Sequence, residues 1–227
     1  MRRFTLNSAL WLLATTISAR PATTSAAISM PSLCQTVHCA CGKVKLAINS
    51  PSVLRLICYC KDCRGYYNTL NEMARSKGME PQAKLDEWGG VDMTQIYPSE
   101  IKVLEEGQDH LTTCIVRTGS RQKLVYCTCC NTPMFRIGDS SALLNTNLLP
   151  ADANKPNVRF RIIGRDAPKE QAAAAAAAAA VDKKPPMSWS VPFSFPFVML
   201  GRMKKDLMTP VPLDMKDVRV LENFKQG

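Results

Sequence analysis

The sequence is poor in histidine, and long apolar runs are absent. Only two of its 227 residues are histidines, which excludes a His-rich metal site and leaves little room for triad chemistry. No run of eighteen apolar residues occurs, so a membrane-spanning helix is not expected. The first 61 residues contain seven Lys or Arg and no acidic residue. The net charge of +10 therefore comes mostly from the first third of the chain, and the remainder gives no convincing signal for nucleic-acid binding.

Cysteine, by contrast, occurs ten times, and eight of these residues fall into three groups. In an extended segment, residues i and i+2 point to the same side, so Cys39 and Cys41 can present two thiolates to one ion. Cys127 and Cys130 have the spacing of a zinc knuckle, in which a tight turn brings two sulfurs together. Together these four residues predict a closed, structural zinc site.

The middle group predicts a second zinc site of a different kind. Cys58, Cys60 and Cys63 offer three ligands within six residues, and no obvious fourth ligand stands beside them. Three protein ligands with one open position are typical of catalytic zinc, where the open position takes water or substrate. These three cysteines are therefore the candidate catalytic residues. All-thiolate ligation favours zinc over magnesium or calcium.

A disulfide framework is the main alternative, and it would suit a secreted protein. Cysteines one residue apart on a strand lie near the long end of disulfide reach, which favours metal binding instead. The usual spacings of iron–sulfur ligands are absent. Cys34 has no assigned role, Cys114 is interpreted as a small buried residue, and Cys129 as an inert neighbour of the knuckle.

Short alternating segments predict a mainly β fold that is small and stabilised by zinc, with an irregular C-terminal extension. Residues 69–95 are polar and rich in turn residues, and we expect a long loop or a short helix there. The strands are expected at residues 44–48, 54–60, 112–116, 123–127 and 158–163.

Both ends of the chain differ in composition from the middle. Residues 1–30 combine arginines with many Ser, Thr and Ala, which predicts a mitochondrial or plastid transit peptide, with a secretory signal as the alternative. Residues 166–186 include nine consecutive alanines, too few for a helix stable by itself, so we interpret them as a low-complexity spacer. The aromatic extension 187–227 is expected to pack on the domain, although a membrane or partner contact is an alternative.

The three cysteine groups, in this order, resemble the glutathione-dependent formaldehyde-activating enzyme family, also called the CENP-V/GFA domain family. The resemblance covers about residues 34–165, and it depends on the stretches 39–42 (CACG), 58–64 (CYCKDCR) and 127–133 (CTCCNTP). Two positions depart from the family pattern. Tyr59 stands where the family usually has His, beside the predicted open zinc, and Asn131 stands where it usually has Gly. Asn tolerates a positive φ better than most residues, so we expect the turn at Asn131 to form.

The resemblance implies an Mss4-like β fold with zinc in both cysteine sites and glutathione or another small thiol near the open one. It implies a carbon–sulfur lyase that forms or cleaves S-hydroxymethylglutathione from the thiol and formaldehyde. Lys61, Arg64 and Arg136 are candidates for attracting the carboxylates of glutathione. A non-catalytic zinc-binding scaffold or interaction module is the alternative function, and the sequence predicts no oligomeric state.

Overall fold

The computed structural model describes residues 31–51, 53–138, 141–151, 153, 155–182, 187–194, 218–221 and 224. Within this part the protein is mainly β, as predicted, and the predicted targeting peptide at residues 1–30 lies outside it. The strands are β1 (Leu33–His38), β2 (Lys45–Ser50), β3 (Leu54–Cys58), β4 (Val91–Ile96), β5 (Ile101–Leu104), β6 (Leu111–Ile115), β7 (Lys123–Cys127), β8 (Pro133–Ile137), β9 (Ala142–Asn145), β10 (Val158–Ile162) and β11 (Val218–Val220). The helices are α1 (Lys61–Ser76) and α2 (Lys169–Asp182), with short 3₁₀ turns between strands.

The strands form one small and one large sheet. The small sheet has the order β1-β2-β5 and is antiparallel. The large sheet has the order β10-β3-β4-β9-β8-β7-β6-β11, and its first and last pairs are parallel. The five expected strands correspond to β2, β3, β6, β7 and β10. The expected strand 54–60 ends early, at Cys58, because the chain turns into a helix there.

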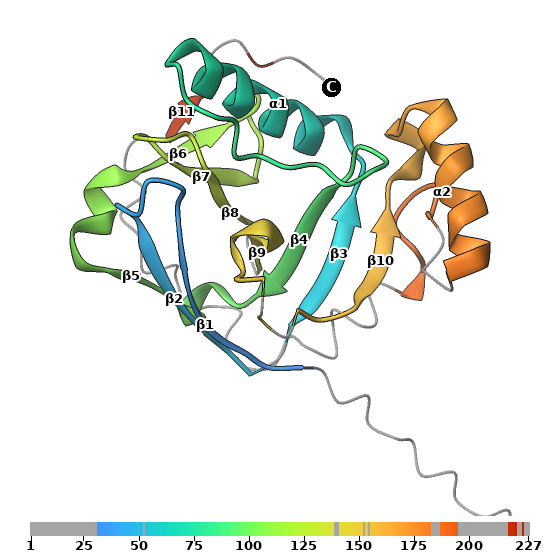
Figure 1. Cartoon of the computed structure of the whole chain (residues 1–227), viewed down its shortest axis with the longest axis horizontal. Helices are drawn as coiled ribbons and strands as arrows, with labels where there is room; N and C mark the ends of the chain where they lie inside the picture. The colour runs from blue at the N-terminus through green and yellow to red at the C-terminus, as the bar shows by residue number, and fades with distance from the viewer. Residues whose placement is uncertain are drawn as a thin grey trace, which may run out of the picture.

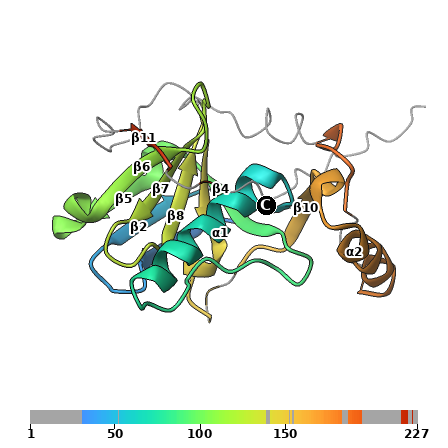
Figure 2. The same cartoon turned by 90° about the horizontal axis from the view of Figure 1, so that it is seen from above.

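The large sheet is covered on both faces in its middle. Val125 of β7 belongs to the core cluster shared with the small sheet, which includes Leu46 and Ile48. The neighbouring Leu124 belongs to the cluster under α1, which includes Tyr66. Successive residues of a strand face opposite sides, so β7 is buried by the small sheet on one side and by α1 on the other. The small sheet and α2 lie at opposite ends of the molecule in both views (Figures 1 and 2).

Helix α1 occupies part of the segment where we expected a loop or short helix. Its apolar positions recur at helical spacing and are buried against the large sheet, namely at Cys63, Tyr66, Tyr67, Leu70 and Ala74. The helix begins after Cys60, whose side chain accepts a hydrogen bond from the backbone N–H of Cys63. It ends at Lys77, followed by Gly78 with a φ of 68°. The strand-to-helix junction at Cys58–Cys60 is therefore the feature that positions the predicted open zinc site.

The alanine run, interpreted above as a low-complexity spacer, forms helix α2. Ala175 is 1% exposed and packs with Tyr59 and Trp88 beside the large sheet. Nine alanines are too few to be helical alone, and the contacts on one face supply the missing stabilisation. Figure 1 shows α2 beside β10 at the end of the sheet.

Two described parts of the C-terminal extension contact the sheet. The backbone of residues 188–190 hydrogen-bonds to residues 161–165, and Met187 bridges to Arg161. Strand β11 adds to the free edge of β6, and Leu221 after it is buried. Among the described residues, no helix has the length and apolarity needed to cross a bilayer.

Candidate metal centres

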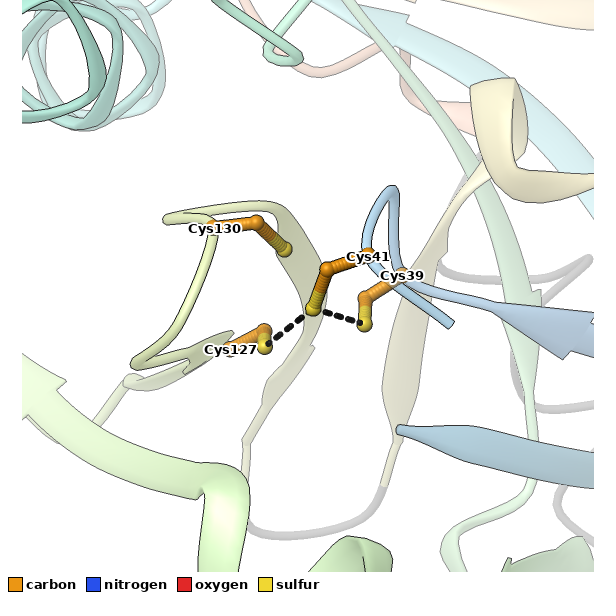
Figure 3. A group of neighbouring side chains, drawn as sticks. All are labelled: Cys39, Cys41, Cys127 and Cys130. Atoms are coloured by element: carbon orange, nitrogen blue, oxygen red, sulfur yellow. Dashed lines mark hydrogen bonds between the residues drawn. The ribbon is translucent and has the colours of Figure 1, made fainter. Parts of the chain in front are cut away.

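The structure brings Cys39, Cys41, Cys127 and Cys130 together into what we call the four-cysteine cluster. Their sulfur atoms all lie within 4.8 Å of one another and point toward a common centre (Figure 3). Cys41 Sγ lies 3.4 Å from Cys39 Sγ and 3.9 Å from Cys127 Sγ. Two loops far apart in the sequence supply the ligands in pairs, as the spacing predicted.

Each loop is a tight turn that requires a residue with positive φ. Cys39 and Cys41 lie in the turn after β1, not within a strand, and Gly42 has a φ of 75°. In the second loop Asn131 has a φ of 53°, and its N–H donates to the carbonyl of Cys127. The prediction that Asn can form this turn is confirmed. The two turns direct their sulfurs inward because the left-handed residue reverses the chain after the last ligand.

Two further residues lie close to the four-cysteine cluster, namely Thr132 and Cys129. The Thr132 hydroxyl lies 3.0 Å from Cys130 Sγ and accepts a hydrogen bond from the N–H of Ala40, so it joins the two loops. Cys129 Sγ is instead 3.3 Å from His110 Nδ1 and outside the cluster. This agrees with the interpretation of Cys129 as a residue that does not bind the metal.

The second set, which we call the three-cysteine cluster, lies where β3 ends and α1 begins. Cys58 is the last residue of β3, Cys60 caps the helix, and Cys63 lies in its first turn. Cys63 Sγ is 2.9 Å from Cys60 Sγ and 3.5 Å from Cys58 Sγ. The positive end of the helix dipole favours thiolates at this position.

Both clusters fit a zinc ion in geometry and in chemistry. Tetrahedral zinc with Zn–S distances of about 2.3 Å separates its sulfurs by about 3.8 Å. The four sulfur separations given above lie between 2.9 and 3.9 Å, and within each cluster all sulfurs lie within 4.8 Å of one another, a spread that includes this value. All ten cysteines lie in the described part of the chain and are free thiols, so the disulfide alternative finds no support. The clusters can hold a metal ion, and thiolate ligands select soft or borderline metals such as zinc.

In each cluster, one thiol has a much lower pKa than its neighbours. Hydrogen bonds with Cys58 and Cys63, followed by the charge of Arg136, lower the pKa of Cys60 to about 2 against the opposing effect of burial. Hydrogen bonds with Cys60 and Cys63 raise the pKa of Cys58. In the four-cysteine cluster, hydrogen bonds with Cys127 and Cys39 lower the pKa of Cys130 in the same way. The direction of these shifts favours one thiolate in each cluster, and a thiolate is the form that binds a metal ion.

A small pocket beside the three-cysteine cluster is lined by two of its cysteines. It has a volume of about 70 Å³, and Cys60 and Cys63 contribute to its wall. Gln122, Arg136 and Asp62 also line it, and Asp62 forms an ion pair with Arg117. The pocket beside the other cluster is lined by Ala40 and Thr132 and not by its sulfurs. The remaining wall of the sulfur-lined pocket consists of Val116, Ser120 and Leu124.

Arg136 and Tyr59 are placed differently from what the sequence suggested. Arg136 Nη1 donates a hydrogen bond to Cys63 Sγ, so its guanidinium group belongs to the cluster itself. Arg64 instead donates to the carbonyl of Asp166. The expectation that Tyr59 lies beside the open zinc is wrong, because Tyr59 points to the other side of the strand and is fully buried.

Tyr59 takes part in a separate buried network on that side of β3. Its hydroxyl donates to Asp86 Oδ2 at 2.8 Å and accepts from Arg161 Nη1 at 2.5 Å. Arg161 also lies 4.1 Å from the ring centroid of Trp88, a cation–π contact. Asp86 and Trp88 belong to the loop before β4, so this part of residues 69–95 packs away from the three-cysteine cluster. Side chains alternate between the two sides of an extended segment, so with Cys58 and Cys60 on one side, Tyr59 is expected on the other. The sequence therefore contained the signal for this placement.

Comparison with known proteins places the chain in a family but gives no activity. Residues 31–203 match DUF6151, which is described as a family of unknown function, and not the formaldehyde-activating enzyme family that the spacing resembles. No curated protein matches the sequence. A crystal structure of a Rhodobacter sphaeroides protein is similar over 53% of this chain and 92% of that chain, with 16% identity and a TM-score of 0.35. A TM-score this low carries no argument about fold or function.

Proposed function

We propose that this chain, which belongs to the DUF6151 family of unknown function, is a zinc protein whose three-cysteine cluster acts on a small thiol and a small aldehyde. The four-cysteine cluster is the structural zinc site in this proposal. The observation that carries it is the difference between the two clusters: one has four inward-pointing sulfurs, and the other has three sulfurs beside a pocket. The resemblance of the cysteine groups to the formaldehyde-activating enzyme family supplies the reaction class, a carbon–sulfur lyase.

Zinc bound to three thiolates would supply a Lewis-acidic position that takes a fourth ligand, such as a thiol, and favours its ionised form. The chain's own residues restrict what reaches this position. A pocket of about 70 Å³ accommodates the reacting end of a ligand but not a whole tripeptide. The rest of glutathione, or of another thiol, would extend over the rim near Ser120 and Arg117.

The reaction joins the thiol sulfur to the carbonyl carbon of the aldehyde. The S–H proton leaves, a carbon–sulfur bond forms, the carbonyl double bond becomes a single bond, and the oxygen takes up a proton. For formaldehyde the product is the S-hydroxymethyl thiol, and the reverse reaction cleaves it. Gln122 Oε1 accepts from Arg136, so the amide NH₂ of Gln122 is the neutral donor that can hydrogen-bond the developing alkoxide.

The test compares the wild-type chain with Cys60→Ser, and Cys34→Ser is the matched control. Cys34 is exposed and lies outside both clusters. We expect two zinc ions per chain in the wild type and in Cys34→Ser, and one in Cys60→Ser with the fold retained. Turnover of formaldehyde with glutathione should be lost only in Cys60→Ser.

Two results would reject this function. The first is unchanged turnover in Cys60→Ser. The second is a cobalt-substituted wild-type chain whose visible spectrum does not respond to an added thiol. A saturated metal site of this kind, together with salt-sensitive binding to nucleic acid or a protein partner, would favour the non-catalytic scaffold instead.

A further inference from the structure

Arg136 makes an unusual set of contacts at the three-cysteine cluster. It lies on β8, and its guanidinium group reaches the first turn of α1, where Nη1 donates to Cys63 Sγ. Its Nη2 donates to Gln122 Oε1, which fixes the plane of the group. Its Nε is buried and has no hydrogen-bond partner among the described residues. A guanidinium group stays protonated in proteins, so Arg136 places a permanent positive charge in the wall of the pocket.

Charge balance shows what this arginine can do. Three thiolates and one divalent metal ion have a formal charge of −1, which the charge of Arg136 cancels. A neutral fourth ligand would leave this sum at zero, and an anionic one would change it to −1. Without Arg136 the same anionic ligand would bring the site to −2, and repulsion between like charges is strong in a partly buried site.

We infer that Arg136 is a specificity-determining residue, which makes the open position of the three-cysteine cluster accept anionic ligands such as thiolates. The inference rests on the proposed function, since it requires a metal ion with an open position. In this role the charge of Arg136 acts on the ligand atom bound at the metal. It does not act on the distant carboxylates of a tripeptide.

Arg117 provides the matched control for this role. It does not line the pocket itself but forms an ion pair with Asp62, which does, and among the described residues it makes no contact with a sulfur atom. Its side chain is 62% exposed, so solvent screens its charge. Arg136→Gln removes one positive charge from the pocket wall, and Arg117→Gln removes one from beside it. Only the first should change the preference for anionic ligands.

The experiment uses the full-length chain loaded with cobalt and follows its visible absorption at constant pH. Each variant is titrated with 2-mercaptoethanol, which binds as an anion, and with imidazole, which binds neutral. In Arg136→Gln we expect thiol affinity to fall by about tenfold or more and imidazole affinity to change by less than about threefold. In Arg117→Gln both should change by less than about threefold. Arg136→Lys, which keeps the charge, should retain the wild-type preference.

The possible results of these titrations test the role of Arg136 separately from the proposed function. If the visible spectrum of the cobalt-loaded wild type responds to neither ligand, the proposed function is rejected, and so is the role of Arg136 that depends on it. A responsive wild type with equal losses for thiol and imidazole in Arg136→Gln overturns the inference alone. If Arg136→Gln does not fold or load, the decisive variant is Arg136→Lys, in which loss of the thiol preference contradicts selection by charge.

Discussion

Asn131 shows how one residue's backbone conformation determines a metal-ligand geometry. Its φ of 53° allows the chain to reverse after Cys130, and its N–H donates to the carbonyl of Cys127. The side-chain oxygen accepts a hydrogen bond from Lys77 Nζ at 3.2 Å, which connects the turn to the end of α1. An L-residue with a Cβ is strained in this conformation unless, like Asn, it tolerates the left-handed region.

We therefore expect Asn131→Ala to be less stable than Asn131→Gly by about 1 kcal/mol. Both variants lose the contact with Lys77, so the difference between them reports the backbone alone. The measurement is urea unfolding of the zinc-loaded chain, with zinc content as a control for site integrity. Equal stability of the two variants would contradict the role assigned to the positive φ.

The sequence predicted which cysteines come together, but it did not predict which other residues contact them. Local spacing indicates which cysteines can share an ion, because a turn or a helix start brings them together over a few residues. Arg136 meets Cys63 across 73 residues of sequence, and Thr132 meets Ala40 across 92. Such contacts depend on strand order in the sheet, which the sequence pattern did not reveal.

At the scale of elements, α1 and α2 differ most from expectation. The buried positions of α1 at Cys63, Tyr66, Tyr67, Leu70 and Ala74 have helical spacing, but Gly65 and the cysteine grouping obscured it. The alanine run has no amphipathic pattern, so its helix could not be predicted from periodicity. Its stability comes from contacts with Tyr59 and Trp88, which are distant in sequence.

Enlarging a buried alanine tests whether α2 is docked in solution. Ala175→Leu should destabilise the chain by about 1–3 kcal/mol, because the side chain would overpack against Tyr59 and Trp88. Ala176→Leu, at an exposed position of the same helix, is the control and should change stability by less than about 0.5 kcal/mol. Thermal unfolding measures both. If the two substitutions behave alike, α2 does not pack as described.

The tyrosines of α1 predict a loss of stability at alkaline pH. Burial raises the pKa of Tyr66 and that of Tyr67 above their usual value. Above about pH 10 these groups ionise in the unfolded chain but stay protonated in the folded one. The folded state then binds more protons, so the free energy of unfolding falls as pH rises.

Urea unfolding between pH 8 and pH 11 measures this slope in the zinc-loaded chain. Tyr67→Phe removes one of the two groups and should make the decline above pH 10 shallower. Stability that is constant from pH 9 to pH 11 would show that these side chains are not buried as protonated phenols.

At the scale of the whole molecule, the two clusters connect very different lengths of chain. The three-cysteine cluster lies within residues 58–63, whereas Cys41 and Cys127 of the four-cysteine cluster are 86 residues apart. Binding a metal in the second case restricts a long loop of the unfolded chain, which has a larger effect on folding.

Chelation should therefore act in two stages. Removal of the metal from the three-cysteine cluster, which has one ligand fewer, should occur first and leave the circular dichroism spectrum almost unchanged. Removal from the four-cysteine cluster should unfold the domain. Zinc release to a chromophoric chelator, recorded together with circular dichroism, distinguishes the stages. Unfolding that accompanies the first equivalent of zinc would contradict this order.

The long loop also has a consequence for how the protein matures. Residues 58–63 lie inside the segment that the Cys41–Cys127 contact closes, so a newly made chain presents the three reactive sulfurs before Cys127 and Cys130 have been synthesised. The direction of synthesis therefore completes the three-cysteine cluster first, while Cys39 and Cys41 still lack the other half of theirs.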